Sequence, residues 1–277
     1  MLGSTHAGAT TRAGRRALRV TIALFIPCLT DQFQPRVAIA CTLVLEHFGH
    51  RVVFPQAQTC CGQPMHNAGY EHEAQVLAAR MIDVFAPFEV VVTPSASCAA
   101  MVREHMQKLF PRDAAKAAAA SSLASRTVEF VEYLERHHRR DIAEAGGRAE
   151  LRWPASAAYH PSCHMRSLGT WTPQPALLES VNGLDVRPLD RPEQCCGFGG
   201  LFALKQAGVS AEMALDKARA ARATGATHLV CNDAGCAMNI AGACRRAGVD
   251  VQSISTAEIL AEALGLLPRE TAKGAGA

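Results

Sequence analysis

A lone cysteine followed by a Cys-Cys-Gly triplet occurs twice in this chain, with 31 intervening residues each time. The two copies are Cys28 with Cys60-Cys61 and Cys163 with Cys195-Cys196. The second copy begins 135 residues after the first. Because a recurrence at constant spacing is typical of internal repeats, the chain is predicted to consist of two copies of one domain.

A further matched pair of segments supports the duplication. Residues 90–101 (VVVTPSASCAAM) and 228–239 (HLVCNDAGCAMN) each run from an apolar, strand-like stretch through a short polar turn into an Ala-rich stretch. Each places a cysteine, Cys98 or Cys236, at the beginning of that last stretch. Every copy therefore holds four cysteines in the same order.

Cysteine is the unusual component of an otherwise ordinary globular composition. The 277 residues include 11 Cys, in a chain large enough to fold without disulfide bonds. A net charge of +3 and 5% aromatic residues provide neither the basic surface nor the stacking side chains of a nucleic-acid-binding protein. In a reduced compartment, such cysteines point to metal or redox chemistry.

The amino-terminal segment is predicted to be a tail and not a targeting signal. Residues 1–18 are basic and are expected to be a disordered tail, and Val20–Ile26 is expected to form the first strand. This apolar run is short, and Pro27 occupies the place where a signal peptide needs a small cleavable residue. Since no apolar run approaches the length needed to cross a bilayer, the protein is expected to be cytoplasmic and not membrane-spanning.

Strand-like and helix-like segments alternate along both halves, which predicts an α/β fold with two pseudo-repeated domains, each a small parallel sheet flanked by helices. Residues 114–138 are expected to form one long Ala-rich helix. The expected strands are 20–27, 51–55, 89–93, 155–160, 184–188, 227–231 and 249–254, and the expected helices are 35–48, 71–86, 173–182, 210–224 and 236–247. The expected divisions are a first domain (19–138), a linker (139–152), a second domain (153–265) and a flexible tail (266–277).

The predicted topology gathers the cysteines of each half. Each matched cysteine follows a predicted strand, and the loops after parallel strands meet at one edge of a sheet. Four thiolates brought together repel one another unless a cation compensates them, so a metal ion or an iron–sulfur cluster is the expected occupant. The candidate ligands are Cys28, Cys60, Cys61, Cys98, Cys163, Cys195, Cys196 and Cys236.

This twice-repeated pattern resembles the CCG cysteine-rich domain family, which includes the B-type subunit of heterodisulfide reductase and the iron–sulfur subunit of glycolate oxidase. Within that family, the chain looks most like the lactate-utilization group. The resemblance implies an iron–sulfur oxidoreductase subunit, most simply with 4Fe-4S clusters, that oxidises L-lactate to pyruvate with two partner proteins and is not active alone. The matching segments are FIPCLTDQFQP, QTCCGQPMHNAGY, TPSASCAAMV, YHPSCHMRSLG and QCCGFGGLFALK.

The chain departs from the family pattern in both halves. The five-cysteine form of the motif ends in a close Cys pair, but Met101 stands where the first half would need its last cysteine. In the second half, Cys231 is a possible extra ligand at a different spacing, and Pro161 replaces an expected acidic residue. Four ligands per half are therefore expected, without a non-cubane centre.

Other interpretations remain open from the sequence. Cys41 and Cys244 have no matched partner and are expected to pack in the core. His66, His160 and His164 lie beside the cysteines and are expected to bond to neighbouring backbone rather than to a metal. A structural zinc protein, a disulfide-reductase-like protein and a protein acting in glycolate oxidation are the alternative functions.

Overall fold

The computed structural model describes residues 20–170 and 173–269. The predicted basic tail and the end of the predicted flexible tail lie outside these residues. The described part of the predicted flexible tail is packed: Leu266 and Leu267 lie against the core, and the Arg269 guanidinium lies 4.6 Å from the Trp153 ring centroid.

Two four-stranded parallel sheets form the framework, and both have the same strand order. The first has the order β2-β1-β3-β4 and the second β6-β5-β7-β8. This shared order confirms the predicted α/β class and the pseudo-repeat. The strands are β1 (Thr21–Leu24), β2 (Arg51–Val53), β3 (Val90–Thr93), β4 (Thr127–Glu129), β5 (Arg152–Tyr159), β6 (Asn182–Arg187), β7 (His228–Val230) and β8 (Gln252–Ile254).

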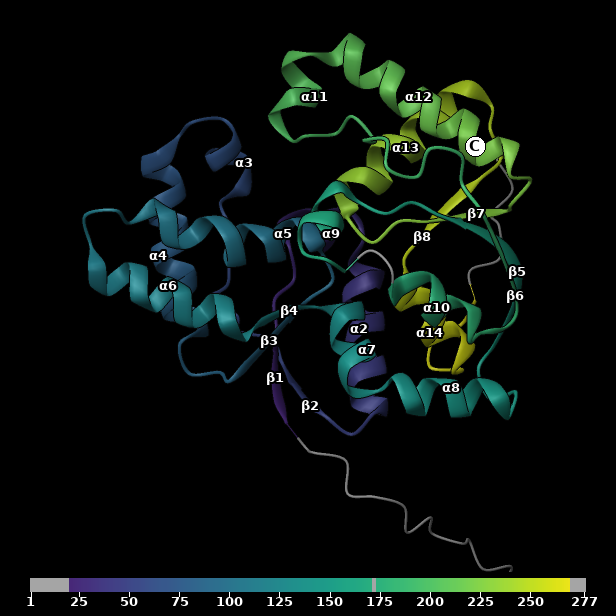
Figure 1. The fold of residues 1–277 in the computed structure, drawn as a ribbon, viewed down its shortest axis with the longest axis horizontal. Helices are drawn as coiled ribbons and strands as arrows, with labels where there is room; N and C mark the ends of the chain where they lie inside the picture. Colours follow the sequence, from purple (N-terminus) through teal and green to yellow (C-terminus); the bar gives the residue numbers. More distant parts are fainter. Residues whose placement is uncertain (1–19, 171–172, 270–277) are drawn as a thin grey trace, which may run out of the picture.

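Helices connect the strands in both halves (Figure 1). Those of the first half are α1 (Cys28–Phe33), α2 (Pro35–His47), α3 (Gln63–Asn67), α4 (Glu71–Phe85), α5 (Ala96–Ala100), the π-helix η1 (Met101–His105), the 3-10 helix η2 (Met106–Leu109), α6 (Ala114–Arg126), α7 (Phe130–His137) and α8 (Arg139–Gly147). Those of the second half are α9 (Cys163–Ser167), α10 (Pro173–Glu179), α11 (Leu201–Lys205), α12 (Ala207–Ala223), α13 (Ala234–Ala247) and α14 (Thr256–Ala263).

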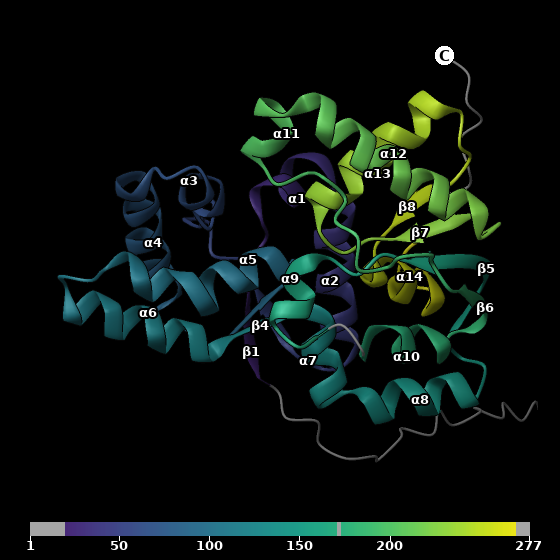
Figure 2. The same ribbon diagram turned by 45° about the horizontal axis from the view of Figure 1, so that its top comes forward.

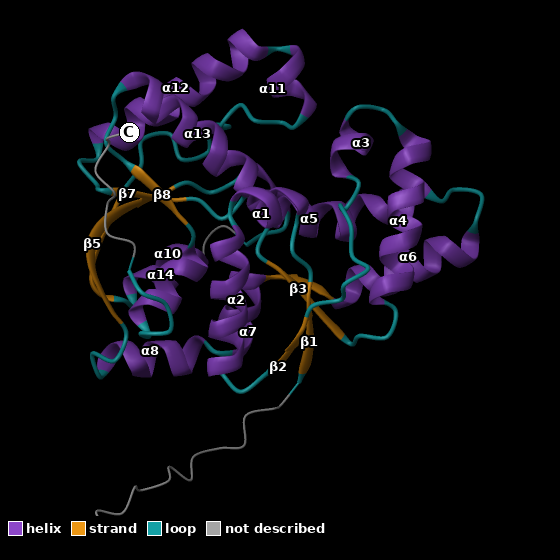
Figure 3. Cartoon of the chain, turned by 180° about the vertical axis from the view of Figure 1, so that it is seen from behind, coloured by secondary structure: helices purple, strands orange, loops and turns teal. Residues whose placement is uncertain are grey.

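Helices α2, α7, α10 and α14 lie between the two sheets and form a core that both halves share (Figure 3). Alternate residues of β1 point to opposite faces: Ile22 and Leu24 join this shared core, whereas Ala23 and Phe25 pack with α4 and α6. Helices α12 and α13 cover the other face of the second sheet. The sheets are therefore buried on both faces, as parallel sheets require.

The helix contacts of the shared core are reciprocal. Helix α2 packs on α14, and α10 packs on α7. Helices α7 and α14 both follow the last strand of their sheet, and both begin with a capping box, Glu129 with Glu132 and Ser255 with Glu258. Each half thus presents the same pair of helices to the other, which relates the halves by an approximate two-fold axis.

The predicted long helix at 114–138 is wrong. Helix α6 ends at Arg126, residues 127–129 pair with β3 as a fourth strand, and α7 begins at Phe130. The β-branched pair Thr127 and Val128 favours an extended strand over a helix at this point. The predicted linker, 139–152, contains helix α8, whose Ile142 side chain is buried in the shared core.

The helices that carry Cys28, Cys98, Cys163 and Cys236 meet between the two halves (Figure 2). Helix α1 contacts α13, and α5 contacts α9, so each cysteine-bearing helix of one half touches one from the other half. The loops beyond the strand ends therefore bring both cysteine sets to one region.

Among the described residues, no helix combines the length and the apolarity needed to cross a membrane.

Candidate metal centre

The four matched cysteines of the first half lie together at the end of its sheet. Cys28 begins α1, Cys60 and Cys61 lie in the loop before α3, and Cys98 lies in α5. The sulfur atoms of Cys28 and Cys60 are 3.6 Å apart, and those of Cys61 and Cys98 are 3.4 Å apart. The structure thus brings all four predicted donors of this half into one cluster, which we call the first cysteine cluster.

The second half repeats this arrangement. Cys163 begins α9, Cys195 and Cys196 lie in the loop before α11, and Cys236 lies in α13. The Cys196 and Cys236 sulfur atoms are 3.0 Å apart. These four residues are the second cysteine cluster.

The glycine after each cysteine pair has a local role that its backbone explains. Gly62 and Gly197 have φ angles of +85° and +80°, a conformation that side-chain-bearing residues rarely adopt. In this turn the Gly62 N–H donates to the Cys60 sulfur at 3.4 Å, and the Gly197 N–H donates to the Cys195 sulfur at 3.3 Å. Such N–H donors stabilise negative charge on sulfur, as they do around iron–sulfur clusters.

Contacts between the thiols shift their pKa values in opposite directions. Hydrogen bonds from Cys28 and Cys61 lower the pKa of Cys60, and hydrogen bonds from Cys163 and Cys196 lower that of Cys195. The pKa of Cys28 is raised by its bond to Cys60 and by burial. Each cluster therefore favours one thiolate supported by protonated neighbours, and a bound cation would take the place of those protons.

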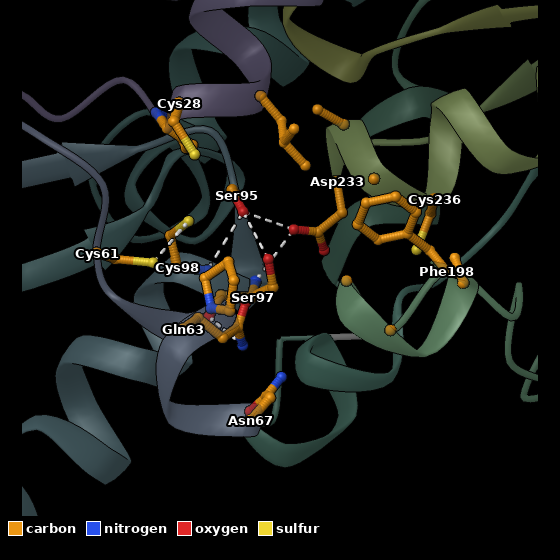
Figure 4. A pocket seen from close by; sticks show the side chains of 18 of the residues that line it. Cys28, Cys61, Gln63, Asn67, Ser95, Ser97, Cys98, Phe198, Asp233 and Cys236 are labelled. Atoms are coloured by element: carbon orange, nitrogen blue, oxygen red, sulfur yellow. Dashed lines mark hydrogen bonds between the residues drawn. The ribbon is translucent and has the colours of Figure 1, made fainter. Parts of the chain in front are cut away.

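Both cysteine clusters line a single cavity of about 660 Å³ between the halves. In Figure 4, Cys28, Cys61 and Cys98 lie on one side of it, and Cys236 lies on the other beside Phe198. Most of the cavity wall is apolar, and Asp233, Gln63 and His164 are among its few polar side chains. The two clusters are therefore separate sets of donors that open into one shared space.

Polar contacts cross between the halves beside this cavity (Figure 4). The Ser95 hydroxyl donates to Asp233 Oδ1 at 2.6 Å, and the Ser97 N–H donates to the same oxygen at 3.1 Å. The Gln63 side-chain amide lies 3.1 Å from His164 Nε2, and His164 Nδ1 lies 3.5 Å from the Cys163 sulfur. These contacts fix the two cysteine clusters relative to each other.

His160 does not form the backbone hydrogen bond that the sequence led us to expect. The residue is 2% exposed, and neither ring nitrogen has a hydrogen-bond partner among the described residues. A ring nitrogen of His160 and the sulfur atoms of Cys196 and Cys236 lie within 4.8 Å of one another. Burial, together with the nearby Lys217 charge, lowers the pKa of His160 to about 4.

Sequence reasoning missed Lys217. This lysine lies in α12, is completely buried, and donates to the backbone carbonyls of Arg191 and Pro192 just before the second Cys-Cys pair. The signal was available, because Ala214, Lys217, Ala218 and Ala221 occupy the i, i+3, i+4 and i+7 positions of a buried helical stripe. Burial lowers the pKa of Lys217.

The remaining singled-out residues lie elsewhere. Cys41 is in the shared core, and Cys244, a residue of α13, is buried in the core that α12 and α13 form with the second sheet. Cys231 follows β7 and is buried in the same group of apolar side chains as Cys244. It does not line the cavity. The His66 ring lies 5.0 Å from the His105 ring, measured between centroids.

The donor set fits a thiolate-bound metal centre in each half. Four sulfur atoms converge, a backbone N–H points at one of them, and a buried imidazole without a hydrogen bond lies beside the second cluster. Thiolate sulfur is the ligand of iron–sulfur clusters and of many zinc sites. The arrangement supports metal binding.

The comparison with known families decides the classification. The model of the CCG cysteine-rich domain matches residues 22–103 and again residues 157–241, one match in each half. The chain belongs to the CCG cysteine-rich domain family. The two matches coincide with the two halves of this CCG protein that carry the cysteine clusters.

Relatives of known name agree with that assignment. Lactate utilization protein A of Macrococcus caseolyticus (strain JCSC5402) is 43% identical over 240 residues, which cover 86% of this chain and 95% of the relative. Lactate utilization protein A 2 of Bacillus cereus (strain AH820) is 38% identical over 244 residues, covering 88% and 98%. The lactate-utilization resemblance seen in the sequence is thereby confirmed.

Likeness to solved structures is weak. Glutamate racemase from Francisella tularensis aligns over 89% of this chain and 80% of its own, with 9% identity and a TM-score of 0.34. This likeness bears on neither the fold nor the function of the CCG protein.

Proposed function

We propose that this CCG protein is the iron–sulfur electron-transfer subunit of a cytoplasmic multi-protein system that oxidises L-lactate to pyruvate. The observation that carries the proposal is the convergence of eight repeat-matched cysteines as two clusters on one cavity. The names of the relatives supply the metabolic context. The eight matched cysteines are the proposed ligands.

The chain's own residues would hold and shield the centres. The cysteines of each cluster supply the thiolates, and the N–H groups of Gly62 and Gly197 stabilise charge on sulfur. An iron–sulfur cluster of the 4Fe-4S type, once bound, supplies one-electron redox chemistry. Burial of Cys61, Cys98 and Cys196 limits the access of water to these sulfur atoms, whereas Cys28 and Cys163 are exposed.

The electron count of the proposed reaction fits one metal centre in each half and a partner protein that reacts with lactate. Oxidation of L-lactate to pyruvate releases two electrons and two protons. This chain offers one cysteine cluster per half, which provides places for two one-electron carriers. It has no Gly-x-Gly-x-x-Gly dinucleotide fingerprint, so we assign the chemistry on lactate to a partner protein.

Exposed apolar side chains at the cavity support the involvement of partners. Phe33, Tyr70 and Leu204 line the cavity and are 61%, 52% and 78% exposed. Large apolar side chains grouped at a surface commonly mark an interaction site. The proposed partners are the two other proteins of the lactate-oxidising system, one of them an iron–sulfur protein.

Growth of a deletion strain tests the substrate. A strain that lacks this protein is expected to lose growth on L-lactate, to keep growth on glycolate, and to recover on lactate when the wild-type chain is restored. The Cys196→Ser chain should fail to restore it, whereas the Cys244→Ala chain should succeed. Loss of growth on glycolate alone would assign the protein to glycolate oxidation instead.

Structural zinc is the second candidate, and the sulfur separations in the first cysteine cluster favour it, although the Cys196 and Cys236 sulfur atoms are only 3.0 Å apart. Sulfur atoms on one tetrahedral zinc ion lie about 3.8 Å apart, which follows from a bond length of about 2.3 Å. The observed separations of 3.4 and 3.6 Å in the first cysteine cluster are close to that value. Analysis of bound metal and inorganic sulfide separates the two candidates.

A further inference from the structure

One difference between the two cysteine clusters is the ring that precedes the lone cysteine of each half. His160 and Phe25 each stand three residues before the lone cysteine of their half, Cys163 and Cys28. Phe25 is fully buried and packs edge-on against Phe85, with 5.6 Å between ring centroids. The second half therefore has a nitrogen-bearing ring where the first half has a hydrocarbon ring.

The imidazole of His160 is placed as a metal ligand needs to be. One of its ring nitrogens lies within 4.8 Å of the sulfur atoms of both Cys196 and Cys236, which are 3.0 Å from each other. A metal centre held by these two cysteines therefore lies beside an imidazole nitrogen, and iron binds nitrogen donors of histidine as well as thiolate sulfur.

Among the described residues, no neighbour forms a hydrogen bond with the His160 ring. Both ring nitrogens are buried, and burial without a hydrogen-bond partner is unfavourable for a polar group. The nearby Lys217 ammonium already donates to the Arg191 and Pro192 carbonyls. A bond from nitrogen to a metal would remove the penalty for one of the two ring nitrogens.

We propose that His160 ligates the metal centre of the second half through a ring nitrogen, beside Cys196 and Cys236. The two halves then hold chemically different centres, one bound by four sulfur atoms and one in which the His160 nitrogen takes the place of one of the four sulfur donors. In Rieske centres, imidazole ligands set one iron–sulfur centre apart from others in the same way. This inference rests on the proposed iron–sulfur function.

Nitrogen hyperfine coupling tests the assignment directly. The full chain is produced with ¹⁵N-labelled histidine, purified without oxygen, and studied by pulsed EPR as isolated and after dithionite reduction. The wild type is expected to show one strongly coupled histidine nitrogen. The coupling should disappear in His160→Phe, which installs the first-half residue, and should persist in the matched control His164→Phe.

The outcomes keep this inference separate from the proposed function. A wild-type protein that holds iron and inorganic sulfide but shows no strong histidine coupling overturns the ligand assignment alone. A coupling that His164→Phe removes and His160→Phe keeps overturns it as well. A protein without iron and sulfide would instead overturn the proposed function. If the His160→Phe chain does not fold, His164→Phe decides: a coupling that persists in it supports His160, and a coupling that it removes overturns the assignment.

Discussion

Ser95 and Asp233 occupy the same position in the two repeats, three residues before Cys98 and Cys236, and they bond to each other at 2.6 Å. Ser95 also accepts a hydrogen bond from the Cys98 N–H and so caps its own helix, α5. Asp233 makes no such cap on α13 and accepts from the Ser97 N–H instead. One side chain from each copy therefore ties the halves together beside the cavity.

Removing the Asp233 carboxylate is expected to loosen this junction. The residue is 4% exposed, and hydrogen bonds to a buried charged group are worth about 1.5–3 kcal/mol. Asp233→Ala should lower the free energy of unfolding by about 2–3 kcal/mol, as measured by anaerobic urea denaturation. Asp185→Ala is the control, because Asp185 pairs with Arg187 at the surface and should cost under about 1 kcal/mol. Equal losses in the two variants would contradict the role of the junction.

Alanine at Gly197 is expected to be much more damaging than alanine at Gly69. Both residues have φ near +80°, which costs an alanine about 1–2 kcal/mol. A Cβ at Gly197 would also lie 2.8 Å from Met213 Cβ and 2.9 Å from the Ser210 carbonyl oxygen, whereas nothing lies within 4 Å at Gly69. Gly197→Ala should lower the unfolding free energy by at least about 3 kcal/mol and reduce bound metal. Gly69→Ala should leave bound metal unchanged, and a loss of metal in both variants would argue against this difference.

The sorting of cysteines into ligands and core residues predicts a pattern of iron loss. Cys60→Ser and Cys196→Ser are each expected to remove about half of the bound iron, because each disables one cluster of four donors. Cys41→Ala and Cys244→Ala should keep the wild-type iron content, since both side chains lie in the core away from the cavity. Iron and acid-labile sulfide are measured per chain. A similar loss in all four variants would show that the sorting is wrong.

A buried pair of histidines is expected to make the protein less stable in mild acid. Burial, and next the neighbouring His138, lower the pKa of His50 from 6.5 to about 4, and the two rings are in contact through nitrogen atoms 2.7 Å apart. Between these pH values the unfolded chain takes up a proton that the folded chain excludes. The unfolding free energy should therefore fall by up to about 3 kcal/mol from pH 6.5 to pH 4 on account of His50.

The variant His50→Phe isolates this effect. Its unfolding free energy, measured in urea from pH 4.5 to 7.5, should depend less steeply on pH than that of the wild type. His72→Phe, at an exposed position of α4, should keep the wild-type slope. A His50→Phe slope equal to the wild-type slope would contradict the account.

The duplication made most of the fold predictable, because alternating strands and helices in two copies leave few arrangements of a parallel sheet. The Ala-rich composition of Ala114–Arg126 led to the wrong prediction of one helix over 114–138, because the Ala-rich run continues into residues that form β4. A three-residue strand has too little sequence to show a period of its own, and its pairing with β3 decides its conformation.

The clustering of cysteines within each half was also predictable, because each matched cysteine follows a strand. The relation between the halves was not. The Ser95–Asp233 bond, the single cavity and the isolated His160 ring depend on how the two copies pack, which the pattern within one copy does not encode. The helical stripe predicts that Lys217 is buried, but it does not predict the distant backbone carbonyl that accepts its hydrogen bond.

Metal and sulfide analysis of the wild-type chain, purified without oxygen, tests the central claim most directly. We expect iron and acid-labile sulfide in similar amounts, enough for one cluster in each half, with visible absorption that bleaches when dithionite is added. Zinc without inorganic sulfide would contradict the electron-transfer function and establish the eight cysteines as a structural metal site.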